Sequence, residues 1–260
     1  MARINGKELA VEKQGGGDAL VMVHGLGGTS NTYTPIVGPL SRFFTIIRFD
    51  LEGSGRSPRT GELSIPGFTA DLLAVMAAHD VGAAHLVGHS MGTMICQHAA
   101  AAHPDKVRSL VLLGPLAEPP EAARQAMRDR AGKARGEGMA AVAETLVVAA
   151  TSAESRAHRP AAVALVRELL MRQDAENYAR TCEALAVSRA ADLAAIRCPT
   201  LLLTGDEDGV APPPAVRKLA KSIAGAELRI FAGCGHWTPV EKPVEVAEAM
   251  LDFYFRPPAK

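Results

Sequence analysis

Two kinds of segment follow one another along this chain: short apolar runs, and longer stretches in which apolar residues recur at helical spacing. Turn residues follow each apolar run, which is typical of buried strands. These runs occupy residues 19–23, 44–49, 83–87, 109–113, 199–205 and 227–231. Segments with helical spacing, such as residues 67–79, separate several of them. Strands that alternate with helices predict a mostly parallel sheet covered by helices on both faces, with ligands at the carboxyl ends of the strands.

The N-terminal segment departs from this alternation. Residues 3–14 alternate in polarity around Asn5-Gly6. That dipeptide favours the tight turn of a β-hairpin, so we expect a hairpin here.

A second departure begins near Leu116 and ends near Arg189. The strand pattern stops, and the segment is rich in alanine and arginine with helical spacing. Because it follows a core strand directly, we interpret it as a helical cap that excludes water and shapes a pocket, rather than as a surface insertion. The expected division is an α/β core of residues 1–115 and 190–260, with a cap of residues 116–189.

One strand-to-helix junction carries the strongest chemical signal. Residues 88–92 read Gly-His-Ser-Met-Gly, between the apolar run at 83–87 and a helical pattern over residues 93–102. A serine between two glycines at such a junction indicates a nucleophile elbow, a tight turn that projects the hydroxyl from the sheet. Ser90 is the expected nucleophile.

A serine nucleophile needs a general base, which in turn needs a carboxylate to orient it. His236 lies in a glycine-rich loop directly after the apolar run 227–231, which suits the base. The other histidines fall in helical, strand or loop contexts typical of packing or surface positions.

Three carboxylates follow the apolar run 199–205 and are candidates for the orienting acid. Asp208 is preferred, while Asp206 is expected to bind backbone amides of the turn and Glu207 to be solvated. Glu118, after the run 109–113, is the alternative acid.

Acyl transfer also requires donors for the oxyanion of the tetrahedral intermediate. The backbone amide of Met91 is one expected donor. The other is the amide of Leu26, in the glycine-rich loop after residues 19–23. We expect His24 to brace this loop rather than to act as a second catalytic histidine.

Together these motifs resemble those of the α/β-hydrolase superfamily, in the family's order and over nearly the whole chain. The matching segments are residues 24–27, 49–57, 88–92, 205–208 and 235–236. The resemblance implies an α/β-hydrolase fold with a helical cap insertion. Glu52 stands where the family has a basic residue, a departure in a structural loop, and Asp50 is expected to tie that loop down.

Within the superfamily, residues 171–185 resemble a cap segment of 3-oxoadipate enol-lactonases and related small esterases. This resemblance implies a serine hydrolase that cleaves carboxylic esters or lactones of short to medium acyl chain. Alternatives are an enol-lactonase or acyl-homoserine-lactone hydrolase proper, a cofactor-free perhydrolase or haloperoxidase, a C–C hydrolase, or a slow-turnover signalling receptor. Several cap arginines are candidates for binding a substrate carboxylate: Arg124, Arg128, Arg156, Arg159, Arg167 and Arg172.

Composition narrows the classes of partner and location. The 260 residues include 28 basic and 28 acidic side chains, so the zero formal charge and the lack of a basic stripe argue against nucleic-acid binding. No apolar run is long enough to span a bilayer, and no signal-peptide core begins the chain. The four cysteines lack paired or metal-ligand spacing, which favours reduced thiols in the cytoplasm. We therefore expect a cytoplasmic enzyme with a small-molecule substrate, no cofactor and no metal; a homo-oligomer is compatible with this pattern.

Overall fold

The central element of the fold is a seven-stranded sheet with the strand order β3-β5-β4-β6-β7-β8-β9. The computed structural model describes residues 1–256 of the chain. The strands are β3 (Val11–Gly15), β4 (Asp18–Val23), β5 (Phe44–Phe49), β6 (Ala84–His89), β7 (Val107–Leu113), β8 (Thr200–Gly205) and β9 (Glu227–Phe231). β3 is antiparallel to β5, and the remaining pairs are parallel. The predicted α/β class with a mostly parallel sheet is confirmed.

The N-terminal hairpin is shorter than predicted. It consists of β1 (Ala2–Ile4) and β2 (Lys7–Leu9), with Asn5 and Gly6 both at positive φ as a type I′ turn requires. After Ala10 the chain enters β3, which pairs with β5 instead of extending the hairpin. The edge of the large sheet thus takes residues that the alternation alone assigned to the hairpin.

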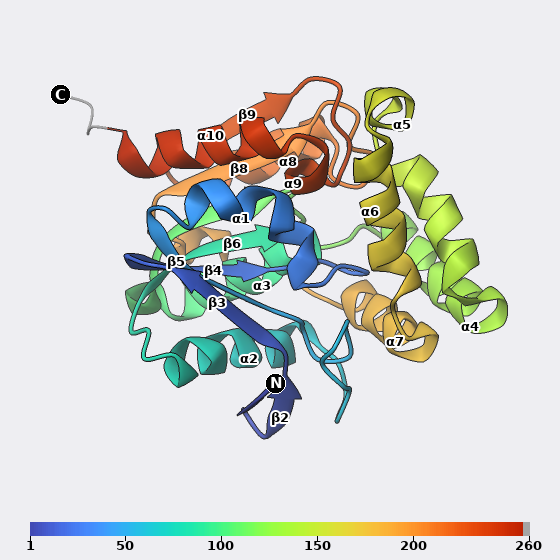
Figure 1. The fold of residues 1–260 in the computed structure, drawn as a ribbon, viewed down its shortest axis with the longest axis horizontal. Helices are drawn as coiled ribbons and strands as arrows, with labels where there is room; N and C mark the ends of the chain where they lie inside the picture. Colours follow the sequence, from blue (N-terminus) through green and yellow to red (C-terminus); the bar gives the residue numbers. More distant parts are fainter. Residues whose placement is uncertain (257–260) are drawn as a thin grey trace.

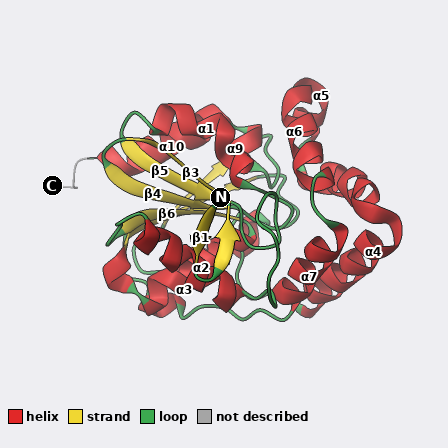
Figure 2. Cartoon of the chain, turned by 60° about the horizontal axis from the view of Figure 1, so that its bottom comes forward, coloured by secondary structure: helices red, strands yellow, loops and turns green. Residues whose placement is uncertain are grey.

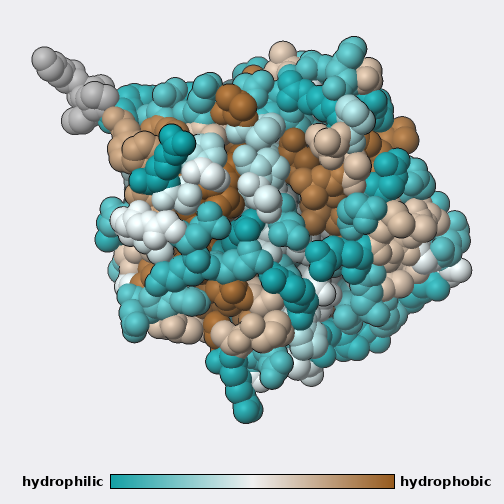
Figure 3. Space-filling view, viewed as in Figure 1, coloured by the Kyte–Doolittle hydropathy of each residue, from teal (hydrophilic) through white to brown (hydrophobic). Residues whose placement is uncertain are grey.

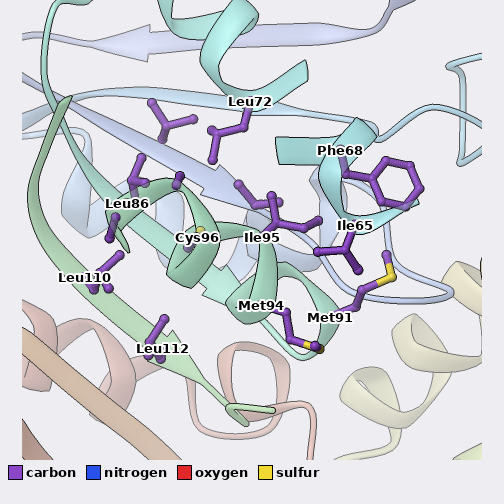
Figure 4. Close-up of a cluster of buried hydrophobic side chains, with 14 of the residues drawn as sticks. Ile65, Phe68, Leu72, Leu86, Met91, Met94, Ile95, Cys96, Leu110 and Leu112 are labelled. Carbon is purple, nitrogen blue, oxygen red and sulfur yellow. The ribbon is translucent and has the colours of Figure 1, made fainter. Parts of the chain in front are cut away.

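Helices cover both faces of the sheet (Figures 1 and 2). One face carries α1 (Thr34–Leu40) and α10 (Pro243–Phe255); the other carries α2 (Ile65–Ala78), α3 (Met91–Ala102) and α8 (Pro213–Lys221). Strand alternation supplies both layers, since β4 gives Val21 and Val23 to one core cluster and Leu20 and Met22 to the other. Figure 4 shows the first cluster, where side chains of α2 and α3 pack on those of β6 and β7.

Four helices between β7 and β8 form a separate layer beyond the carboxyl ends of the strands (Figures 1 and 2). They are α4 (Glu121–Ala150), α5 (Ala153–His158), α6 (Pro160–Met171) and α7 (Ala175–Ala186). Their shared apolar cluster includes Trp237 and Val240, which follow His236 in sequence. The layer therefore rests directly on the loop that carries the expected base.

Helix α4 is divided into two arms at Gly138. The φ of 80° and ψ of 175° at this residue lie in a region that side-chain-bearing residues avoid. Residues 121–137 and 139–150 consequently run as separate arms of one bent element, visible on the right of Figure 2.

Short elements complete the chain. They are α9 (Thr238–Glu241) and three 3₁₀ turns at Ser30–Tyr33, Pro104–Lys106 and Leu193–Ala195. The face drawn in Figure 3 is mostly polar, with a group of apolar side chains beside α6. Within residues 1–256, no helix has both the length and the apolar character needed to cross a membrane.

Candidate active site

Ser90 occupies the turn between β6 and α3 in a strained backbone conformation. Its φ of 53° and ψ of −121° are unusual for a residue with a side chain. The turn is held because the Ser90 amide donates a 2.9 Å hydrogen bond to the carbonyl of Leu113 on β7. The backbone at Gly92 passes so close to β4 that a side chain does not fit there, since a Cβ would lie 2.0 Å from the carbonyl oxygen of Val23. This is the local geometry that the glycine-flanked motif predicted.

His236 and Asp208 meet at the carboxyl ends of neighbouring strands, β9 and β8. The His236 Nδ1 lies 2.9 Å from Oδ2 and 3.1 Å from Oδ1 of Asp208. With Nδ1–H donating to the carboxylate, Nε2 is left as a proton acceptor. Both side chains are almost fully buried, so this pair is shielded from bulk water.

Further donors hold the Asp208 carboxylate. Its Oδ1 accepts from the amides of Val210 (2.9 Å) and Ala211 (2.7 Å), and the Thr204 hydroxyl lies 3.2 Å from Oδ2. Burial opposes ionisation of Asp208, but the attraction and hydrogen bond from His236 and the two amides outweigh it. The net result lowers the pKa of Asp208 to about 2.

The other candidate acids have partners other than His236. Asp206 accepts from the amide of Cys234 at 3.3 Å, the backbone role expected of it. Glu207 was expected to be solvated; it is exposed but also accepts from the amide of Ala153 at the start of α5, at 2.8 Å. Glu118 forms ion pairs with Arg124 and Arg189. Of these carboxylates, only Asp208 is hydrogen-bonded to His236 in the described part of the chain.

Glu241 is a buried carboxylate whose role was not predictable from the sequence. Its oxygens accept from the amides of Ser152 (2.8 Å), Gly235 (3.1 Å) and Trp237 (3.1 Å). Two of these amides flank His236, and the third belongs to the α4–α5 junction. Glu241 therefore joins the loop of His236 to the helical layer.

His89, next to Ser90, supports the same loop. Its Nε2 lies 3.0 Å from the backbone carbonyl of His236, and its ring packs 5.1 Å from that of Trp237. Burial and the neighbouring His236 lower the pKa of His89 to about 3, so it is neutral and donates this hydrogen bond. The expected role as a structural neighbour of the nucleophile agrees with these contacts.

The loop after β4 lies against Ser90. A Cβ on Gly25 would be only 2.6 Å from the Cβ of Ser90, and the loop is closed by a 3.0 Å bond from the Gly28 amide to the Gly25 carbonyl. Within residues 1–256, neither the Leu26 amide nor the Met91 amide donates to a protein group. Both amides are thus available to a substrate oxygen.

His24 and Asp50 brace the loops around this site. The Leu51 amide donates to Nε2 of His24 at 2.9 Å, and Nδ1 of His24 bonds to the Gly25 carbonyl at 2.8 Å. Asp50 accepts from the amides of Ser30 (2.7 Å) and Arg56 (3.0 Å). The contacts match the bracing roles expected for both.

Glu52, the departure from the family pattern, is buried in the same loop region. It accepts from the Thr60 amide at 2.7 Å and pairs with Lys7 at 2.7 Å. Its contacts are with loop and hairpin residues, in keeping with a structural role.

Ser90 and His236 line one small cavity of about 50 Å³. Ser90 is 7% exposed, so a reactant must approach it through this space. The other lining residues are Leu26, Leu116, Met127, Arg130, Leu146, Ala150, Leu185, Val210 and Trp237. The lining is apolar apart from Ser90, His236 and Arg130, and the expected carboxylate-binding arginines are absent from it. No group of three or more His, Cys, Asp or Glu side chains within residues 1–256 could hold a metal ion.

Comparison with known proteins identifies the family of the chain. A family model described as the alpha/beta hydrolase fold matches residues 18–243. A pimeloyl-[acyl-carrier protein] methyl ester esterase of Chromobacterium violaceum is 32% identical over 237 residues, covering 88% of this chain and 91% of that protein.

Solved structures of similar fold include two hydrolases. The enol-lactonase of Burkholderia xenovorans LB400 is 29% identical with a TM-score of 0.90, covering 97% of this chain and 98% of that one. A thermophilic esterase from Thermogutta terrifontis is 26% identical with a TM-score of 0.90, covering 95% and 93%.

Proposed function

This chain belongs to the α/β-hydrolase fold family, and from that membership we propose that it is a serine hydrolase of carboxylic esters or lactones. The observation that carries the proposal is the meeting of three groups. Ser90 sits on a strained turn, and His236, hydrogen-bonded to the buried Asp208, lines the same cavity. This arrangement has the parts of a nucleophile, a base and an orienting acid.

The proposed reaction begins when the Ser90 hydroxyl attacks the carbonyl carbon. Nε2 of His236 takes the hydroxyl proton, and Asp208 stabilises the imidazolium that forms. The amides of Leu26 and Met91 donate to the oxyanion of the tetrahedral intermediate. Collapse expels the alcohol with the proton from His236 and leaves an acyl-enzyme. A water activated by His236 then releases the acid and restores Ser90.

The substrate class is proposed from the shape and lining of the site together with the relatives. The narrow apolar cavity favours short to medium acyl groups over long lipid chains. The similar proteins include a methyl ester esterase and an enol-lactonase, which support an ester or lactone linkage. We propose that α4–α7 act as a cap, with residues 116–189 as a unit inserted into the core formed by 1–115 and 190–260.

The proposal also includes a cytoplasmic location and a small-molecule substrate. The four cysteines are unpaired within the described chain, which supports a reducing, cytoplasmic location. The reaction as written uses only protein groups and water, so a small-molecule substrate is its only required partner.

Kinetics of Ser90→Ala test the function. Wild type should hydrolyse 4-nitrophenyl butanoate, and Ser90→Ala should lose at least about a thousandfold in kcat with an unchanged circular dichroism spectrum. Near-normal activity in the variant would contradict the assignment. Lack of turnover in wild type, on this ester and on a panel of lactones, would favour the signalling receptor instead.

A further inference from the structure

Arg130 is the one side chain with a permanent positive charge among those that line the Ser90 cavity. It lies on the first arm of α4 and is partly buried. Around it the lining is apolar, with Met127 one turn before it and Leu146 on the second arm. A guanidinium in such surroundings is costly unless an anion compensates it.

No carboxylate of the described chain supplies that compensation. Arg130 forms no ion pair within residues 1–256, whereas most arginines of the helical layer do. Those with carboxylate partners are Arg124, Arg128, Arg135, Arg159, Arg167, Arg180 and Arg189. Arg156 bonds to backbone carbonyls, and Arg172 is exposed and away from the cavity.

Arg130 also lies at the entrance to the Ser90 cavity. Arg130 and Leu146 line both the Ser90 cavity and an outer groove of about 280 Å³ between the two arms of α4. The cavity of about 50 Å³ is too small for a whole substrate, since ligand sites commonly measure ~300–1,000 Å³. A substrate bound at Ser90 would therefore extend past Arg130 into the groove.

The groove contains two other charges, which do not cancel that of Arg130. Lys133 has Glu137 3.6 Å away, and Asp129 accepts a 2.7 Å hydrogen bond from Gln125. Neither Asp129 nor Glu137 forms an ion pair with Arg130, which lies where cavity and groove meet.

The phenol of Tyr178 is a second polar group beside Arg130. The Tyr178 side chain is buried, and its hydroxyl faces the Arg130 guanidinium and the Cys182 thiol. Burial raises the pKa of Tyr178, and the neighbouring charge of Arg130 opposes that rise. The Tyr178 ring also packs on the loop beside Leu26, where a Cβ on Gly27 would lie 3.2 Å from it.

We propose that Arg130 is a substrate-binding residue that selects esters or lactones bearing a carboxylate distant from the scissile bond. The planar guanidinium can bind both oxygens of a carboxylate, and it would hold this group at the junction while the carbonyl reaches Ser90. This inference rests on the proposed function and adds the charge of the substrate to it.

The test compares two esters that differ at one end. Mono-4-nitrophenyl adipate carries a carboxylate where 4-nitrophenyl hexanoate carries a methyl group. In Arg130→Gln, KM for the adipate ester should rise about 10- to 100-fold with kcat little changed, since a distant group contributes uniform binding. The constants for the hexanoate ester should stay within about twofold of wild type.

Two further variants sharpen the comparison. Arg130→Lys should recover part of the lost affinity, because it keeps the charge but not the planar fork. Arg128→Gln is the matched control, since Arg128 lies two residues away, pairs with Glu121 and does not line the cavity. It should leave the ratio of kcat/KM for the two esters unchanged.

Inhibition by free adipate supplies an independent readout. Adipate should compete with the hexanoate ester in wild type and in Arg128→Gln, and far more weakly in Arg130→Gln. If Arg130→Gln changes kcat/KM for both esters by the same factor, or leaves both unchanged, the inference is overturned while the hydrolase function stays intact. Loss of hexanoate hydrolysis in wild type would instead contradict the function itself.

Discussion

Ser90 and Asp208 show how single residues set the chemistry of this site. The turn forces Ser90 into a strained conformation that points its hydroxyl into the cavity. Asp208 receives two backbone amides and the His236 ring, so its carboxylate is both fixed in position and ionised. Backbone strain thus positions Ser90, the proposed nucleophile, whereas hydrogen bonds and charge position Asp208, the proposed acid.

The identity of the acid gives a prediction at this scale. Asp208→Asn should lower kcat by about 10³–10⁴-fold, because an amide cannot stabilise the imidazolium or fix the His236 tautomer. Asp206→Asn and Glu118→Gln are the matched controls and should cost less than about tenfold. Steady-state kinetics on one aryl ester, with unfolding curves for each variant, make the comparison. If Asp206→Asn is the more damaging change at equal stability, Asp208 is not the acid.

At the scale of elements, long-range contacts fix loops that local sequence leaves free. The His236 loop is held by Glu241, whose partners include Ser152, 89 residues earlier in the chain. The bend at Gly138 folds α4 back, so both arms contribute to the cavity lining. The helical layer and the His236 loop therefore form one packed unit.

Glu241→Gln should weaken that unit. The glutamine has one acceptor oxygen for three amides and sets an NH₂ group against an N–H donor. We expect the free energy of unfolding to fall by about 2 kcal/mol and kcat to fall by about tenfold or more. Urea unfolding and kinetics measure both, with the exposed Glu248→Gln as the control. Wild-type kcat in a destabilised Glu241→Gln would show that the carboxylate stabilises the fold without positioning His236.

At this same scale, the sequence predicted most strands and the expected triad because their signals are local. Apolar runs, turn residues and the glycines at 88 and 92 lie within a few residues of what they determine. Glu241 and the proposed role of Arg130 were not predicted because both depend on contacts between segments distant in the sequence. Arg130 lies three residues after Met127, so a helix places both on one face, and this spacing was the available signal.

At the scale of the whole molecule, buried histidines couple stability to pH. Burial lowers the pKa of both His24 and His89 below the ordinary value of 6.5. The groups that act on His89 are His236, Asp208 and His24, and Asp50 acts on His24. Since the unfolded chain binds these protons first, stability is retained above about pH 6.5 and lost below it.

We therefore expect the free energy of unfolding to fall by about 1–3 kcal/mol between pH 7.5 and 5.5. Asp208, with its lowered pKa, adds a second loss only as pH falls from about 4 towards 2. Urea unfolding at the two pH values measures the first loss. His89→Gln should reduce it by about 1 kcal/mol, while the exposed His158→Gln should not. An equal loss in wild type and His89→Gln would contradict this origin.

In the proposed mechanism, Ser90 attacks the substrate carbonyl and carries the acyl group. The most direct test is intact-protein and peptide mass spectrometry after treatment with a serine-directed organophosphonate. We expect one adduct per chain, located on Ser90, with loss of activity in proportion to labelling and no adduct in Ser90→Ala. A stable adduct on another residue, or full activity in labelled protein, would contradict it.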